Sequence, residues 1–150
     1  MADQLVSEYI VYRSGYKYQL EKTYSIKTDI KPLAVINTNF IRLDYAGLLT
    51  IKEGYAWDGP SGPTEDTPSF MRGSLVHDAL YQLMREGLLD RDDYRKPADE
   101  LLKKICLEDG MNPFRAEYVY RAVRIFGKSY NTKPDPNPII YAPKKPNFIN

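Results

Sequence analysis

The sequence has little of what would cross-link a small fold or direct it to a membrane or a nucleic acid. A single cysteine, Cys106, excludes an intramolecular disulfide. Lys and Arg number 21 against 20 for Asp and Glu, and a net charge of +1 argues against a nucleic-acid-binding protein, which usually carries a clear basic excess. No apolar run approaches transmembrane length, and the first residues lack the pattern of a signal peptide. We therefore expect synthesis in a cytoplasm and a soluble protein there.

Histidine is just as scarce, because His77 is the only one in 150 residues. One histidine and one cysteine argue against a structural zinc site. What is present is typical of a globular chain, with 43% hydrophobic and 27% charged residues. Five of the 11 prolines lie in the last 20 residues. We expect one domain over residues 1–130 and an extended Pro-rich tail over 131–150.

The first third of the chain has the alternating pattern of β-strands. Aromatic and aliphatic residues alternate with polar ones over 16–28 and again over 40–58. Ile41, Leu43 and Tyr45 lead into Ala46-Gly47, which predicts a hairpin there. A loop rich in glycine and proline follows over 58–69.

Three helices are expected after this loop. The first runs from Pro68 or Ser69 to about Arg85, and the second follows Pro97 and stops near Gly110. In the third, Asn112 is the cap and Gly127 the end. Its expected buried face consists of Phe114, Val119, Ala122, Val123 and Phe126. The expected fold class is α+β, with N-terminal antiparallel β-hairpins followed by a three-helix core.

Residue types with chemical potential gather around His77. His77 and Tyr81 are four positions apart and project from one face of the first helix. Asp99 lies 22 positions after His77 (99 − 77), where an antiparallel second helix can bring its carboxylate to the imidazole and fix the imidazole tautomer. Such a trio predicts a general base with an orienting carboxylate.

Two further carboxylates suit a hard cation. Asp78 follows His77 on the helix and points about 100° away from it. Asp58 opens the Gly-Pro loop, in which Gly59 is placed to offer backbone oxygen. Two carboxylates with loop carbonyls are typical calcium ligands, so Asp58, Asp78 and Gly59 are the candidate metal site.

This order of residues resembles the core of the secreted phospholipase A2 superfamily, most of all its prokaryotic branch. The stretches "WDGPSGP", "HDALY" and "ADELL" are similar to a D-G-x-S loop, a helix carrying H-D-x-x-Y and a later helix carrying an aspartate. The resemblance implies that His77 activates a water molecule and that Asp99 orients it, with Tyr81 hydrogen-bonded in the same network. It also implies that Asp58 and Asp78 bind calcium together with loop oxygens.

A second resemblance covers more of the chain, from about residue 40 to 128. The stretches "GYAWDGPSGP", "GSLVHDALY", "RKPAD" and "YRAVRIFG" are similar to four motifs of an uncharacterised phage and prophage family, a domain of unknown function. This resemblance implies a phage-encoded protein that is made in the host cytoplasm, with association with the virion as the alternative location. Its implied partners are phage structural proteins or a second copy of the chain, reached through the C-terminal tail.

Two readings of these patterns stay open. A buried histidine held by a carboxylate can pin two helices without any reaction. Arg121 and Arg124 are interpreted as solvated charges or as partners of an acidic stretch rather than as a phosphate site. That stretch consists of Asp90, Asp92 and Asp93.

The sequence thus predicts a calcium-dependent hydrolase of a phospholipid or another ester. The alternative from another class is a non-catalytic component of the virion or tail that keeps the scaffold, with its Pro-rich tail on a neighbouring subunit. A small inhibitor or binding module acting against a host system is a third class.

Overall fold

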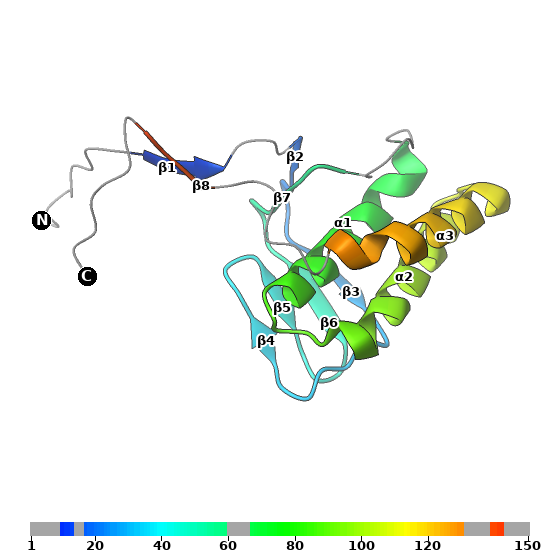
Figure 1. The fold of residues 1–150 in the computed structure, drawn as a ribbon, viewed down its shortest axis with the longest axis horizontal. Helices are drawn as coiled ribbons and strands as arrows, with labels where there is room; N and C mark the ends of the chain where they lie inside the picture. The colour runs from blue at the N-terminus through cyan, green and yellow to red at the C-terminus, as the bar shows by residue number, and fades with distance from the viewer. Residues whose placement is uncertain (1–9, 14–16, 60–66, 131–138, 143–150) are drawn as a thin grey trace, which may run out of the picture.

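The computed structural model describes residues 10–13, 17–59, 67–130 and 139–142, which form antiparallel strands followed by three helices (Figure 1). The expected α+β class is confirmed. No helix in the described part of the chain is both long and apolar enough to cross a membrane. The elements in chain order are β1 (Ile10–Arg13), β2 (Tyr18–Gln19), β3 (Tyr24–Lys27), β4 (Ile36–Asn37), β5 (Ile41–Leu43), β6 (Leu48–Ile51), β7 (Ala56–Trp57), α1 (Pro68–Arg85), α2 (Arg91–Glu108), α3 (Pro113–Tyr130) and β8 (Ile139–Ala142).

The strands form one four-stranded antiparallel sheet and two short ribbons. The sheet has the order β3-β6-β5-β4, and the ribbons pair β2 with β7 and β1 with β8. The predicted hairpin is confirmed as β5 and β6, in which Ile41 faces Ile51. Tyr45 lies in the turn and is 61% exposed, so it does not extend the buried alternation of Ile41 and Leu43. Of the expected tail, 139–142 is extended as β8, and the rest lies outside the described residues.

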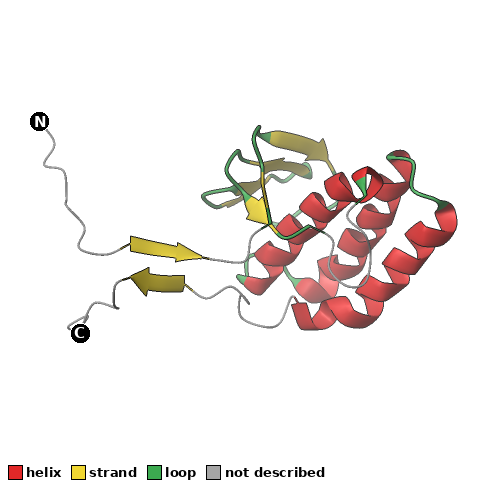
Figure 2. Ribbon diagram, turned by 90° about the horizontal axis from the view of Figure 1, so that it is seen from above, coloured by secondary structure: helices red, strands yellow, loops and turns green. Residues whose placement is uncertain are grey.

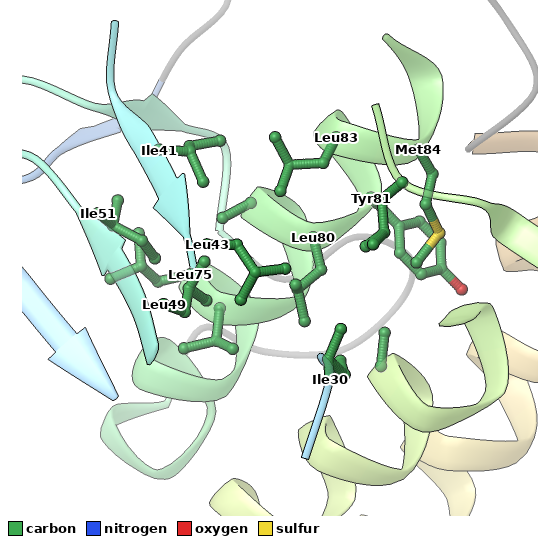
Figure 3. Close-up of a cluster of buried hydrophobic side chains, with 14 of the residues drawn as sticks. Ile30, Ile41, Leu43, Leu49, Ile51, Leu75, Leu80, Tyr81, Leu83 and Met84 are labelled. Atoms are coloured by element: carbon green, nitrogen blue, oxygen red, sulfur yellow. The ribbon is translucent and has the colours of Figure 1, made fainter. Parts of the chain in front are cut away.

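The main core lies between the four-stranded sheet and α1. Figure 3 shows Ile41, Leu43 and Ile51 of the sheet opposite Leu80 and Leu83 of the helix. All five side chains are fully buried. Each contributes about 1.5–3 kcal/mol to folding through the apolar surface that it removes from water. This core fixes the rotation of α1 and therefore the direction of the helix face that points away from the sheet.

That opposite face of α1 packs on α2, and α2 packs on α3 (Figure 2). Gly73 allows the close approach, because a Cβ there would lie 3.0 Å from both Cys106 Sγ and Leu102 Cδ1. Cys106 is buried, as its position on an apolar stripe predicts, and burial raises the pKa of its thiol to about 11. The second apolar cluster, between the helices, consists of Phe70, Leu102, Cys106, Met111, Ala116 and Val119.

The predicted bounds are right for α1 and wrong for the start of α2. The second helix begins at Arg91, so Pro97 lies inside it rather than before it. Pro97 removes one helical hydrogen bond, but two features stabilise the turn ahead of it. The Asp90 side chain accepts the Asp93 N–H at 3.0 Å, and acidic residues in the first turn interact favourably with the helix dipole.

The predicted inner face of α3 is also partly wrong. Asn112 caps the helix through the Phe114 N–H, as expected, but the helix continues past Gly127 to Tyr130. Phe114 is 88% exposed and Phe126 is 66% exposed, although both were expected to be buried. The buried side is instead formed by smaller residues, because these allow α3 to pack closely on α2. Val119 is buried as predicted, and the buried positions that the prediction missed are Ala116 and Gly127.

Candidate functional site

The structure brings His77 of α1 and Asp99 of α2 together. Nε2 of His77 lies 2.7 Å from Oδ1 of Asp99. His77 is 8% exposed and Asp99 is 0% exposed, so bulk water does not compete for this contact. The 22-residue separation is closed by the packing of the two helices, as the sequence predicts.

Tyr81 belongs to the same cluster. Its hydroxyl donates to Oδ1 of Asp99 at 2.5 Å, and its ring lies 4.0 Å from the His77 ring, centroid to centroid. Figure 3 shows Tyr81 on the side of α1 away from the sheet core. Burial raises the pKa of the phenol, and its hydrogen bond to Asp99 adds to the rise. Tyr81 therefore acts as a permanent hydrogen-bond donor.

Arg124 of α3 completes the surroundings of Asp99. Its Nη1 donates to Oδ2 of Asp99 at 2.8 Å. The interpretation of Arg124 as a partner of the acidic stretch at the start of α2 is therefore wrong, and its interpretation as a solvated charge holds only in part, since the side chain is 32% exposed. Arg121 pairs with Glu117 one turn earlier on the same helix at 3.0 Å, which is an ordinary surface ion pair.

These contacts set the protonation states of the pair. Burial opposes ionisation of Asp99, but hydrogen bonds from His77, Tyr81 and Arg124 outweigh it and hold the pKa of Asp99 below its usual value. An ionised carboxylate only accepts hydrogen bonds, so the facing Nε2 of His77 carries the proton in this contact. In the neutral imidazole, Nδ1 is then the ring nitrogen that carries the lone pair.

The low pKa of Asp99 predicts a loss of stability in acid. A carboxyl group whose pKa is lower in the folded chain contributes stability above its usual value of 3.8, and this stability is lost as the pH falls through the folded value. We expect the free energy of unfolding to fall more steeply below pH 3.8 in the wild type than in Asp99→Asn. Urea unfolding at neutral and acid pH measures the two slopes. Equal slopes would mean that Asp99 does not drive the acid loss.

The two other predicted carboxylates lie near each other beside this pair. Asp58 follows β7, where the Trp57 indole N–H donates to Ser74 Oγ of α1 at 3.2 Å and holds the strand against the helix. Asp58 is exposed and accepts the Lys17 N–H at 3.1 Å. Burial raises the pKa of Asp78 to about 6; His77 and Arg85 partly offset this rise, and the negative charge of Asp58 adds to it.

A carboxyl group whose pKa is raised by a neighbouring carboxylate is a place where a cation is favoured. Gly59, also predicted as a ligand, is buried and has φ of 77°, a backbone conformation that favours glycine. Among the described residues, no three His, Cys, Asp or Glu side chains form a metal-binding group. The calcium site at Asp58, Asp78 and Gly59 therefore stays a prediction. The remainder of the predicted loop, 60–66, lies outside the described residues.

An open groove on the surface lies elsewhere. It runs between α2 and α3 and includes none of the predicted site residues. Lys103 crosses it to Glu117 and lies over the Tyr120 ring. Its lining is Glu100, Lys103, Lys104, Leu107, Glu108 and Tyr120.

Comparisons with protein-family models, curated proteins and solved structures find no match. The geometry alone is compatible with a hydrogen-bonded cluster that joins three helices. It also has the parts of a general base, namely an imidazole that a carboxylate orients through Nε2.

Two residues near this cluster were not predicted as part of it. Gly127 of α3 is buried, and a Cβ there would lie 2.5 Å from the Tyr81 hydroxyl oxygen. Arg95 of α2 donates to the main-chain oxygens of Val123 and Arg124. A glycine within an apolar helical pattern is the signal that points to Gly127, because helix interiors disfavour glycine unless close packing requires it. No comparable pattern marks Arg95.

Proposed function

We propose that this protein is a calcium-dependent ester hydrolase of phage or prophage origin, with His77 as the base that activates water. The observation that carries the proposal is the buried 2.7 Å contact between His77 Nε2 and Asp99 Oδ1. It leaves Nδ1 as the proton acceptor and supplies an ionised carboxylate behind the ring.

The residues of this chain account for the proton steps of such a hydrolysis. Nδ1 of His77 takes a proton from water while the water oxygen bonds to the ester carbonyl carbon. Asp99 stays ionised and stabilises the imidazolium, because three donors favour its charged form. The imidazolium then returns the proton to the departing alkoxide oxygen as the bond from the carbonyl carbon breaks, which leaves a carboxylic acid and an alcohol.

Asp58, Asp78 and the backbone at Gly59 are the residues that would hold the calcium ion. A bound calcium ion supplies positive charge for the negative charge that develops on the carbonyl oxygen. Asp78 directly follows His77 in α1. A calcium ion at Asp78 and the His77 base would therefore lie close enough to act on the same ester group. A phospholipid is the substrate class that the resemblance to phospholipases suggests.

The phage-like motifs support a functional rather than accidental cluster. His77 and Tyr81 come from "GSLVHDALY", Asp99 from "RKPAD", and Arg124 from "YRAVRIFG". These stretches are far apart in the chain, yet their polar residues meet at one carboxylate. Convergence of separate motifs on one buried group is typical of a site.

Calcium is expected to raise the melting temperature of the wild-type protein. Saturation at about 100 times the dissociation constant stabilises the folded state by about 2.7 kcal/mol, a rise of about 5–10 °C for a chain of this size. The measurement is a thermal melt with and without calcium at about pH 8, above the raised pKa of Asp78.

Asp78→Asn should abolish this rise, whereas Asp92→Asn, which removes an exposed carboxylate in the first turn of α2, should keep it. A wild-type protein that does not respond to calcium, or an equal response in Asp78→Asn, contradicts the metal site.

One observation favours the alternative, a non-catalytic virion or tail component. Phe114, Tyr118 and Ile125 of α3 are 88%, 56% and 70% exposed, and their spacing places them on one side of the helix. Exposed apolar surface of this kind often marks contact with another protein. A folded wild-type protein that hydrolyses no ester with or without calcium favours this second function.

A further inference from the structure

We propose that Arg124 is a positioning residue, which holds the Asp99 carboxylate in the orientation that the His77 base requires. This inference rests on the proposed function for its catalytic consequence, and on the geometry for the positioning itself. Nη1 of Arg124 lies 2.8 Å from Oδ2 of Asp99. It acts through Asp99, since its described side-chain contact in this cluster is to that carboxylate.

The two oxygens of Asp99 are occupied unequally. Oδ1 accepts from both His77 and Tyr81, whereas Arg124 is the donor to Oδ2 among the described residues. The carboxylate is 0% exposed, so water does not readily replace a lost donor. Without Arg124, Oδ2 is a buried acceptor with no described partner, and the carboxylate is free to rotate towards other donors. Rotation would move Oδ1 away from His77 Nε2.

Arg124 is itself held by a second arginine. Arg95 of α2 uses Nη2 to donate to the main-chain oxygens of Val123 at 3.1 Å and of Arg124 at 2.6 Å. Four residues further along α2, Asp99 accepts from the Arg124 side chain. Thus α2 donates hydrogen bonds to the α3 backbone through Arg95, and α3 donates one to α2 through Arg124. These contacts fix the backbone from which the Arg124 side chain extends.

Gly127 explains how α3 can lie close enough for this contact. One turn beyond Arg124, its missing side chain leaves room for the Tyr81 hydroxyl, which a Cβ would approach to 2.5 Å. Tyr81 and Arg124 therefore both reach Asp99. Helix α3 leaves room for the Tyr81 hydroxyl at Gly127 and provides the Arg124 donor. A helix that only covered the bundle would not need both features.

The test compares Arg124→Gln and Arg124→Lys with the control Arg121→Gln. Arg121 lies on the same helix but pairs with Glu117 and does not contact Asp99. The first measurement is kcat and KM for a dispersed short-chain phosphatidylcholine in the presence of calcium. The second is the downfield ring N–H proton resonance of the only histidine, recorded at one fixed pH, which reports the hydrogen bond from Nε2 to Asp99.

We expect Arg124→Gln to lower kcat by about tenfold to a hundredfold with KM nearly unchanged, because displacing a catalytic group costs rate rather than binding. The ring N–H resonance should broaden or disappear in this variant. Arg124→Lys keeps the charge on a shorter, non-planar group and should give intermediate values. Arg121→Gln should match the wild type in both measurements.

A folded Arg124→Gln protein with wild-type kcat and an unchanged resonance overturns the proposal. If that variant does not fold, Arg124→Lys decides, and wild-type values in both measurements then overturn it. If the wild type hydrolyses no ester, the proposed function fails and the resonance alone decides the positioning role. Loss of the resonance in Arg124→Gln would then support that role without the enzyme activity.

Discussion

His77→Gln is expected to remain folded and to lose about 10²- to 10⁴-fold in kcat, the usual contribution of a positioned general base. Glutamine can place an amide N–H near the position of His77 Nε2 and so keep a donor for Asp99. It has no basic nitrogen to accept a proton from water. The variant therefore separates the chemistry of the imidazole from its hydrogen bond.

The measurement is fatty-acid release from phosphatidylcholine with calcium, together with a thermal melt of each protein. His77→Ala is the matched comparison, because it removes both the base and the donor to Asp99. Loss of activity in both variants, with a clearly lower melting temperature only in His77→Ala, is the expected pattern. A His77→Gln protein that keeps most of its activity would exclude His77 as the base.

Asp99→Ala is expected to be the most destabilising single change in the cluster. Removing one partner of a buried charged network costs about 3–5 kcal/mol, because the remaining groups stay buried without their acceptor. The buried groups are His77 Nε2 and the Tyr81 hydroxyl; the Arg124 guanidinium also loses its partner, but its side chain is 32% exposed and can be hydrated. For a chain of this size the melting temperature should fall by about 6–20 °C.

Glu117→Ala is the control for this change. Glu117 also pairs with two cations, Lys103 and Arg121, but its side chain is 38% exposed, so its loss should destabilise the protein far less. Chemical denaturation of both variants at neutral pH gives the two values. If Asp99→Ala and Glu117→Ala are equally stable, the Asp99 cluster does not hold the helices together.

The parts of the site that the sequence predicts are those encoded by local spacing. His77 and Tyr81 are four residues apart, so any helix through them places both on one face, and the helix itself has clear start and stop signals. Asp99 was predicted because an antiparallel helix pair brings residues of adjacent helices to the same level. The order of strands and helices follows from the same kind of periodicity.

The missed parts depend on contacts between helices that spacing does not encode. Apolar residues on α3 follow a helical period on more than one side, so the sequence favours the large Phe114 and Phe126 as buried. The fold instead buries the side of α3 that carries small residues such as Ala116 and Val119. With α3 in this orientation, the Arg124 side chain reaches Asp99. Pro97 was interpreted as a helix start, because the stabilising cap at Asp90 lies several residues ahead of it.

The two-sided burial of α1 has a consequence for engineering. One face supports the sheet and the other carries His77 and Tyr81, and the buried positions run from Phe70 to Met84. Few positions of this helix can accept random mutation without loss of either the core or the cluster. Mutant libraries that aim at new specificity should therefore leave α1 constant. Diversity is better placed in the β5–β6 turn and on the outer side of α3, where side chains already face solvent.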